Sequence, residues 1–389
     1  MTKGRIRIGV FTATRAEYGL LYPVITALRA SARFDTALIV SGAHLSPDHG
    51  MTVSEIERDG QPIAARVPIQ QPGDDALSVA RTMAAALEGC AQAFDACALD
   101  AVVLLGDRTE LLGAAAAATA LHIPIIHLEG GHLTEGAVDD AIRHAVTKLA
   151  ALHFTAAEPY RQRIIQMGED PDRVFTVGST GLDNLRAEGV RTVAQVGDAL
   201  GLDLTPGYLL TTFHPETLAT AAPAHQMAVL REALDGFAQF KILYTLPNAD
   251  EGNQAIRQAI SDHTTAQPER VFAVESLGRQ RYAWALSGAA AVVGNSSSGV
   301  IEAPMHGVAS INIGDRQAGR LRAPSVIDAP MDAQLIHSAI ARGVSEDFRS
   351  SIRGQVSPMG DGHAGQRIVA ILERIDFTTL GRKRFCDRV

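Results

Sequence analysis

Short apolar runs alternate with helix-like patterns along almost the whole chain, and this alternation constrains the fold more than any other feature. The runs in the first half, such as "IRIGVFTA", "DAVVLLGD" and "IPIIHLEG", are continuously apolar, and most are followed by helical periodicity. Runs of this length are typical of strands that are buried on both faces of a parallel sheet. The sequence therefore predicts an α/β protein with a doubly wound sheet.

The alternation stops over a polar stretch at residues 186–206 and then starts again with "GYLLTTFH", "KILYTL" and "AAVVGNSSS". A chain of 389 residues is also too long for one ordinary core and indicates about two domains. We therefore predict two Rossmann-like doubly wound domains that face a cleft. Their expected bounds are residues 1–187 and 188–370, and residues 371–389 are expected to form a basic tail.

Composition narrows the class of protein. A net charge of −8 argues against a general nucleic-acid binder, which would carry a basic stripe. The N-terminus lacks the apolar core of a signal peptide, and the most apolar stretch is broken by His122 and Pro124, as a helix followed by a strand would be. The three cysteines have no metal-ligand spacing and suit a reducing compartment. We expect a cytoplasmic protein with no membrane partner, no nucleic-acid partner and no metal.

Polar side chains follow the apolar runs in five places: "TATRAEYG", "LLGDRTE", "IIHLEGGH", "LTTFHPET" and "VVGNSSSG". Ligands of open parallel sheets bind beyond the carboxyl ends of the strands, so these positions predict one shared site. The candidates at these strand ends are Arg15, Asp107, Arg108, Glu129, His214, Ser296 and Ser297.

Two features indicate a phosphorylated ligand. The stretch "GNSSSGVIEAP" is typical of a loop that binds an anion at the start of a helix, although a serine N-cap gives the same pattern. Within it, Glu302 could accept both hydroxyls of a ribose, and Arg15 could reach a diphosphate from the first strand–helix turn. The chain has no GxGxxG after the first strand and no GxxxxGK[ST]. An NAD-type or ATP-type site is therefore unsupported, and we expect no cofactor.

Acidic residues gather between residues 127 and 148. Glu129 follows a predicted strand and precedes two glycines, which allow a tight turn and close approach of a ligand. Asp139 and Asp140 open a predicted helix, where they could serve acid–base catalysis or complement the helix dipole. Arg143 lies one turn further on and could pair with either aspartate.

Together the five motifs, with "IHLEGGHLTEGAVDDAIRHAVTK" in full, resemble the hydrolysing UDP-N-acetylglucosamine 2-epimerases of sialic-acid and related nonulosonic-acid pathways. The resemblance runs from residue 8 to about residue 370. It implies the two-domain fold called GT-B, which many nucleotide-sugar glycosyltransferases share, and a homo-oligomer, either a dimer or a tetramer. In one departure, many relatives carry a second acid where this chain has His132, so the substrate preference stays open.

The resemblance also implies roles for individual residues, with UDP held mainly by the second domain. The expected nucleotide- and substrate-binding residues are Arg15, Arg108, Asp140, Gly278, Ser296, Ser297 and Glu302. The expected catalytic residues are Asp107, Glu129, Asp139, Arg143 and His214.

The implied reaction begins with loss of UDP from C1 of the sugar, which makes the C2 proton acidic. A carboxylate removes that proton to leave a glycal, and water then adds at C1 while a proton returns to the other face of C2. We assign the first step to Glu129 or Asp139 and the hydration to Asp107, and the order among these acids stays open. The sugar is UDP-N-acetylglucosamine, giving N-acetylmannosamine, or a UDP- or GDP-linked 2,4-diacetamido relative. The rivals are a GT-B glycosyltransferase, a non-hydrolysing epimerase and an inactive nucleotide-sugar sensor.

Overall fold

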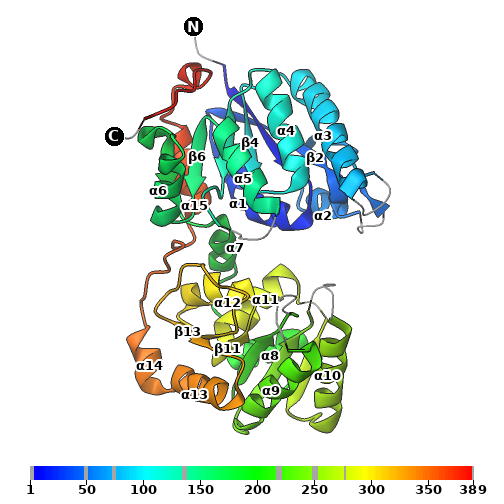
Figure 1. Cartoon of the computed structure of the whole chain (residues 1–389), viewed down its shortest axis with the longest axis vertical. Helices are drawn as coiled ribbons and strands as arrows, with labels where there is room; N and C mark the ends of the chain where they lie inside the picture. Colours follow the sequence, from blue (N-terminus) through cyan, green and yellow to red (C-terminus); the bar gives the residue numbers. More distant parts are fainter. Residues whose placement is uncertain are drawn as a thin grey trace. The chain divides into compact units, whose positions relative to one another are not determined.

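The computed structural model describes residues 4–47, 51–71, 76–133, 138–215, 221–247, 253–275 and 277–387. The chain divides into two compact units, which are coloured by sequence in Figure 1. Unit 1 comprises Met1–Asn184 and Gly362–Val389, and unit 2 comprises Leu185–Asp361.

Unit 1 is built on a seven-stranded parallel sheet with the order β3-β2-β1-β4-β5-β6-β7. Its strands are β1 Ile6–Thr12, β2 Phe34–Ser41, β3 Ile63–Val67, β4 Ala101–Leu105, β5 Ile125–Leu128, β6 Leu152–Thr155 and β7 Val174–Thr176. Its helices include α1 Arg15–Ala30, α2 Val53–Arg58, α3 Ala76–Ala96, α4 Thr109–Ala120, α5 Val138–Leu149, α6 Glu158–Gln166 and α15 Ala364–Leu372. The helix α7 Thr180–Glu188 runs across the boundary into unit 2.

Both faces of this sheet are buried, as the continuous apolar runs predict. In β4, Val103 and Leu105 belong to the core that packs on α1 and α15, whereas Val102 and Leu104 belong to the core that packs on α3 and α4. Successive side chains of a strand point to opposite faces, so an all-apolar strand needs a helical layer on each side.

Unit 2 contains a six-stranded parallel sheet with the order β10-β9-β8-β11-β12-β13. Its strands are β8 Tyr208–Thr212, β9 Lys241–Thr245, β10 Val271–Val274, β11 Ala291–Gly294, β12 Ser310–Ile313 and β13 Val326–Ala329. Its helices include α8 Val193–Leu200, α9 Pro223–Asp235, α10 Asn253–Ala266, α11 Gly278–Gly288, α12 Ser297–Ile301, α13 Ala333–Val344 and α14 Glu346–Ser351. Two doubly wound parallel sheets confirm the predicted fold class.

The domain bounds differ from the prediction at the C-terminal end. Residues 188–370 were expected in the second domain, but the chain returns to unit 1 at Gly362, as the red end of the ribbon in Figure 1 shows. There α15 buries Ile368 and Leu372 in the core that also contains α1. Asp183 fixes the return, because its carboxylate accepts hydrogen bonds from the backbone N–H groups of Ala364 and Gly365, at 2.8 and 2.7 Å.

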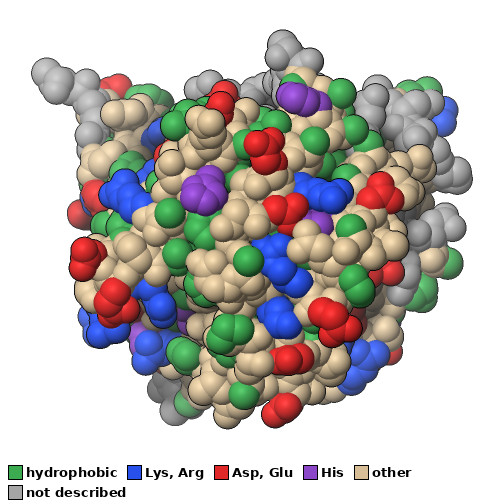
Figure 2. Space-filling model, turned by 90° about the horizontal axis from the view of Figure 1, so that it is seen from below, with side chains coloured by type: hydrophobic (Ala, Val, Ile, Leu, Met, Phe, Trp, Pro, Cys, Tyr) green, Lys and Arg blue, Asp and Glu red, His purple; other side chains and the backbone are tan. Residues whose placement is uncertain are grey.

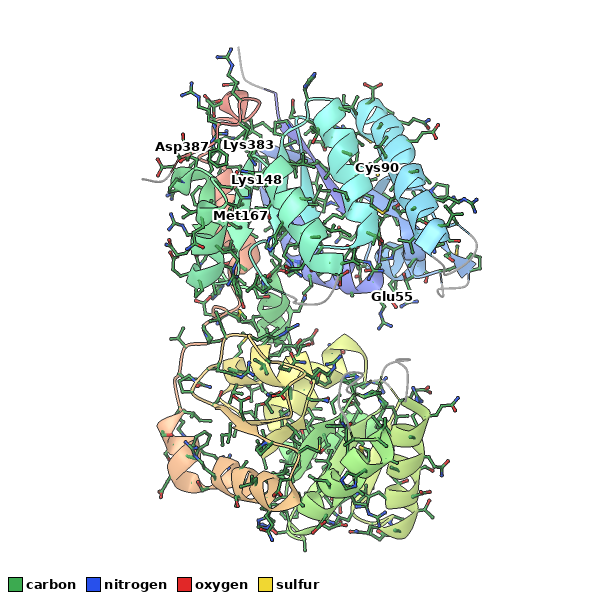
Figure 3. The ribbon with its side chains drawn as sticks, viewed as in Figure 1. Glu55, Cys90, Lys148, Met167, Lys383 and Asp387 are labelled. Carbon is green, nitrogen blue, oxygen red and sulfur yellow. The ribbon has the colours of Figure 1, made fainter. Side chains whose placement is uncertain are left out.

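The basic tail packs on unit 1. The ammonium group of Lys383 donates to the backbone carbonyls of Lys148 and Ala150, at 2.6 and 2.7 Å, and lies 2.8 Å from a carboxylate oxygen of Glu169. Figure 3 shows Lys383 and Lys148 close together on this side of the unit. Carbonyls at the end of a helix lack intrahelical donors, so Lys383 caps the C-terminal end of α5.

The surface is of mixed character on the face drawn in Figure 2, where acidic and basic side chains are interspersed and hydrophobic side chains are scattered among them. Scattered apolar side chains of this kind are normal on a solvated surface. Within the described residues, no helix combines the length and the hydropathy that crossing a membrane would require.

Candidate functional site

Each sheet has a topological switch point, where the strand order reverses. In unit 1 the reversal lies between β1 and β4, and in unit 2 between β8 and β11. Loops at the carboxyl ends of such strands diverge, and ligands of open α/β sheets bind there. The predicted site residues lie at these ends or at the end of the adjacent β5: Arg15 follows β1, Asp107 and Arg108 follow β4, Glu129 follows β5, His214 follows β8, and Ser296 and Ser297 follow β11.

Glu129 adopts a backbone conformation that is uncommon for a residue with a side chain. Its φ is +59°, in the left-handed region, and the next glycine pair completes the turn. One carboxylate oxygen, Oε1, accepts hydrogen bonds from the Ser179 hydroxyl at 3.0 Å and from the Thr180 backbone N–H at 3.4 Å. The other, Oε2, lies 3.0 Å from Nε2 of His132. The turn thus fixes the direction of this carboxylate.

Arg143 joins two of the predicted acids. Its guanidinium is almost fully buried, donates to the carboxylate of Asp107, and donates at 2.9 Å to Oδ1 of Asp140. It also donates to the backbone carbonyl of His132 at 2.9 Å. Of the two partners that the sequence left open, the structure pairs Arg143 with Asp140. Its contacts suit a residue that orders carboxylates rather than one that extends toward a phosphate.

Asp139 and the two other predicted arginines lie in more exposed positions. Asp139 is exposed on the first turn of α5. Arg15 is exposed as well, with Nε 3.2 Å from a carboxylate oxygen of Glu55. Arg108 bonds Glu110 at 3.0 Å. Although burial opposes its charge, the carboxylates of Glu110, Glu17 and Asp139 together raise the pKa of Arg108.

Glu17 is a buried carboxyl group for which the sequence pattern predicts no role in the site. Its Oε2 accepts the backbone N–H groups of Ala13 and Thr14, at 2.9 and 3.0 Å, and so completes a capping box at the start of α1. Burial, with the nearby charge of Glu110, raises the pKa of Glu17 to about 7. The spacing "TRAE" could have predicted the capping box, but it carries no information about the burial.

In unit 2, Asn295 holds the end of β11 against the end of β8. Its side chain accepts from the backbone N–H of His214 at 2.7 Å and donates to the carbonyl of the same residue at 2.9 Å. Its own carbonyl accepts from the side chains of Arg316 and Gln317, at 3.1 and 2.9 Å. Asn295 therefore fixes the spacing between His214 and the serine loop, a role that was not predicted.

The serine loop is a cap, as one of the two sequence interpretations had it. The Ser296 hydroxyl accepts from the backbone N–H of Ser298 at 3.4 Å, and the Ser298 hydroxyl bonds the phenol of Tyr282. The helix that follows, α12, has only five residues, so its dipole is short. Any affinity for an anion must come mainly from hydroxyl and N–H groups, including those of the partly exposed Ser297.

Glu302 and Gly278 complete the predicted set in unit 2. Glu302 lies at the end of α12 and is partly buried, and burial raises its pKa to about 7. Gly278 begins α11 with φ +66°, a conformation that favours glycine.

The structure thus brings together Asp107, Asp140 and Arg143, and links them to Glu129 through His132. Glu135 and Glu216, two further acids of the predicted motifs, lie outside the described residues. Among the residues that are described, no group of three or more His, Cys, Asp or Glu side chains could hold a metal ion.

The two sheets, their switch points and the residues at them define a GT-B-type α/β architecture. Two solved structures have the same fold. The crystal structure of UDP-GlcNAc 2-epimerase from Neisseria meningitidis bound to UDP-GlcNAc has a TM-score of 0.78 at 17% identity, covering 95% of this chain and 100% of the other. The enzyme from Methanocaldococcus jannaschii gives 0.77 at 17% identity, covering 95% and 100%.

The chain belongs to the UDP-N-acetylglucosamine 2-epimerase family, whose model matches residues 26–373. It is 33% identical to a GDP/UDP-N,N'-diacetylbacillosamine 2-epimerase (hydrolyzing) from Campylobacter jejuni, over 98% of this chain and 99% of that protein. It is also 33% identical to a UDP-N,N'-diacetylbacillosamine 2-epimerase (hydrolyzing) from Legionella pneumophila, over 94% of each. A UDP-N-acetylglucosamine 2-epimerase from Neisseria meningitidis is 31% identical, over 87% of this chain and 88% of that protein. The family resemblance of the motifs is confirmed.

Proposed function

We propose that the protein is a hydrolysing 2-epimerase of a UDP- or GDP-linked 2,4-diacetamido sugar. The observation that carries this proposal is the group of acids at the ends of β4 and β5, where Asp107 and Glu129 are each held by fixed donors. The relatives from Campylobacter jejuni and Legionella pneumophila, both named for diacetylbacillosamine, favour the diacetamido sugar. The motifs alone favour UDP-N-acetylglucosamine and leave the diacetamido sugar as the alternative; the two relatives reverse that order.

The chemistry requires two proton transfers on opposite faces of C2. The bond from C1 to the diphosphate oxygen breaks and its electron pair leaves with the nucleotide. Glu129 or Asp139 takes the C2 proton, which leaves a C1–C2 double bond. Water then supplies oxygen to C1, with Asp107 as the group that assists hydration, and a proton adds to the other face of C2. Carboxylates fixed by hydrogen bonds suit such general acid–base steps.

The residues of unit 2 have the nucleotide role in this proposal. Ser296 and Ser297 offer hydroxyl groups, His214 offers its imidazole to the diphosphate, and Glu302 offers a carboxylate to the ribose hydroxyls. Gly278 opens α11 with a left-handed φ of +66°, and we give its backbone a place beside the nucleotide. In unit 1, Arg15 and Arg108 supply positive charge for the departing diphosphate, and Asp140 is a sugar contact.

UDP-N-acetylglucosamine is the second candidate substrate, with N-acetylmannosamine as the product. It is favoured by the Neisseria meningitidis relative, named UDP-N-acetylglucosamine 2-epimerase, at 31% identity. The two candidates differ at C4 of the sugar, where one carries an acetamido group and the other a hydroxyl. Both demand the same acids, so only a substrate comparison separates them.

The test is incubation in deuterium oxide with UDP- and GDP-linked diacetamido sugars and with UDP-N-acetylglucosamine. We expect one nucleotide released per free sugar, inversion at C2, deuterium at C2, and the highest kcat/KM on a diacetamido substrate. Mass spectrometry and proton NMR of the free sugar give the readout. Free sugar that keeps protium at C2 would exclude elimination, and a product formed only with a sugar acceptor would indicate a glycosyltransferase.

The raised pKa of Glu302 predicts that UDP affinity depends on pH. The carboxylate is the form that accepts ribose hydroxyls, and with a pKa of about 7 it is present above pH 7 and lost as the pH falls through 7. Between pH 8 and pH 6 we expect about a tenfold loss of affinity from this group, one pKa unit being a factor of ten. Calorimetric titration with UDP over this range measures it.

The matched control is Glu302→Gln, which retains the shape but not the titration. Loss of a hydrogen bond from a charged acceptor should weaken UDP binding by roughly 1.5–3 kcal/mol at pH 8. The phosphate of UDP titrates in both proteins, so the ratio of their affinities isolates Glu302. A ratio that stays constant from pH 6 to pH 8 would remove Glu302 from the ribose site.

A further inference from the structure

His132 bonds a predicted catalytic acid but was assigned no role from the sequence. Its Nε2 lies 3.0 Å from Oε2 of Glu129, three residues earlier across the glycine turn. A carboxylate can only accept a hydrogen bond. Nε2 of the neutral ring therefore carries the proton, and this N–H donates a hydrogen bond to Glu129. Since Ser179 and Thr180 donate to Oε1, His132 is the donor to Oε2 within the described part of the chain.

The ring of His132 is held in place by packing. It lies over the ring of Tyr160, with 4.0 Å between ring centroids and 32° between the planes. Tyr160 is buried on α6. Stacking on a fixed aromatic ring leaves the imidazole little rotational freedom, so the direction of its Nε2–H is set by the fold.

The backbone around His132 is equally constrained. Its carbonyl accepts from Arg143 at 2.9 Å, and the carbonyl of Gly131 accepts from the guanidinium of Arg163. Gly131 has φ +83°, and a Cβ there would collide with the carbonyl oxygen of Tyr160. These contacts fix the backbone before and after His132. They place His132 between Glu129 and Arg143, the residue that donates to Asp107.

A comparison with His127 shows what is distinctive here. His127 is fully buried, bonds the carbonyl of Gly106 at 2.9 Å and the hydroxyl of Thr147 at 3.2 Å, and burial lowers its pKa to about 3. Those contacts are what a structural histidine needs. His132 is a quarter exposed, and its Nε2–H donates a hydrogen bond to a carboxylate.

We propose that His132 is the positioning residue of Glu129, and that it sets the carboxylate plane in which Glu129 presents its remaining lone pairs to C2 of the sugar. The inference rests on the proposed function, because it assumes that Glu129 exchanges a proton with substrate. A carboxylate held at one oxygen can still rotate, whereas donors on both oxygens fix its plane. Loss of such alignment lowers the rate of the chemical step more than it lowers substrate binding.

The test compares His132→Phe with His132→Gln. Phenylalanine keeps the stacking on Tyr160 and removes the donor, and glutamine keeps a donor on a flexible amide. For His132→Phe we expect kcat to fall ~10- to 100-fold with little change in KM, the size of effect that misalignment gives. For His132→Gln, which keeps a donor but loses the stacking, we expect only part of that loss to be recovered. His225→Phe, an exposed histidine of unit 2, is the control and should turn over like the wild type.

Nitrogen-15 NMR of the imidazoles gives an independent readout. We expect the neutral His132 ring to be protonated at Nε2, with a hydrogen-bonded proton signal that disappears in Glu129→Gln. If the wild type turns over none of the nucleotide sugars, the proposed function fails. If the wild type is active and His132→Phe matches its kcat, or the hydrogen-bonded proton signal persists in Glu129→Gln, the positioning role is overturned.

Discussion

Glutamine in place of Glu129 should lower turnover by at least ~10²-fold, the low end of the contribution of a general acid or base. The amide has nearly the same shape, so Ser179 and the backbone N–H of Thr180 can still bond its oxygen. An amide cannot take a proton from C2, which is the role that the proposed mechanism gives to Glu129 or Asp139. Substrate binding should therefore change little, and the loss should fall on kcat.

Steady-state kinetics and deuterium uptake at C2 measure this effect, with circular dichroism to verify the fold. Glu57→Gln is the matched control, since Glu57 is a half-exposed acid that pairs with Arg66 on the surface of unit 1. Asp139→Asn serves as the comparison, because either acid could remove the C2 proton. Full activity in both Glu129→Gln and Asp139→Asn would exclude these two residues from the proton transfer.

The strands of both sheets were largely predictable, because burial on two faces leaves a continuous apolar run. Two strands were missed, β3 Ile63–Val67 and β13 Val326–Ala329. Both lie at the edge of a sheet and expose part of their length, and their sequences "IAARV" and "VIDA" mix polar with apolar residues. An edge strand pairs with one neighbour and is less buried, so fewer of its residues need to be apolar and its sequence pattern is weaker.

The return of the chain to unit 1 was not predictable from periodicity. The helix α15 has an ordinary amphipathic pattern. That pattern predicts an apolar face but does not indicate which of the two cores the face packs against. The contact that fixes it is Asp183 with the N-terminal backbone of α15, across 181 residues of sequence. Packing of the whole domain determines long-range pairs of this kind, so a local sequence pattern cannot predict them.

The same limit applies to the site. The strand ends singled out Asp107 and Glu129 as candidates, because in a parallel sheet the carboxyl ends share one edge, and helical spacing singled out Arg143. Their partners were predictable only in part, since Asp140 was one of the two partners that the sequence offered to Arg143. Arg143 had two candidate partners one turn away, Asp139 and Asp140, and its bond to Asp107 joins residues 36 positions apart. The left-handed φ of Glu129 could not be predicted either. Such a φ is expected at glycine, and here the glycines follow Glu129 in the sequence.

Methionine in place of Arg143 should destabilise the protein by about 3 kcal/mol, the low end for a broken buried ion pair, because the two carboxylates are partly exposed. The variant leaves Asp107 and Asp140 without the guanidinium between them, and the carbonyl of His132 without its donor. Urea denaturation should show the loss as a lower midpoint with an unchanged slope.

Arg7→Met tests whether burial is the cause. Arg7 and Asp35 form a pair of the same chemistry, 2.7 Å apart, with side chains that are 41% and 46% exposed, whereas the Arg143 side chain is 4% exposed. Water solvates both charges of the surface pair, so its loss should cost at most ~1 kcal/mol. Equal losses in the two variants would mean that burial adds nothing at Arg143. A larger loss for Arg143→Met would show that the buried guanidinium stabilises unit 1, and a fall in kcat in the folded fraction would support the proposed role of Asp107, which Arg143 holds.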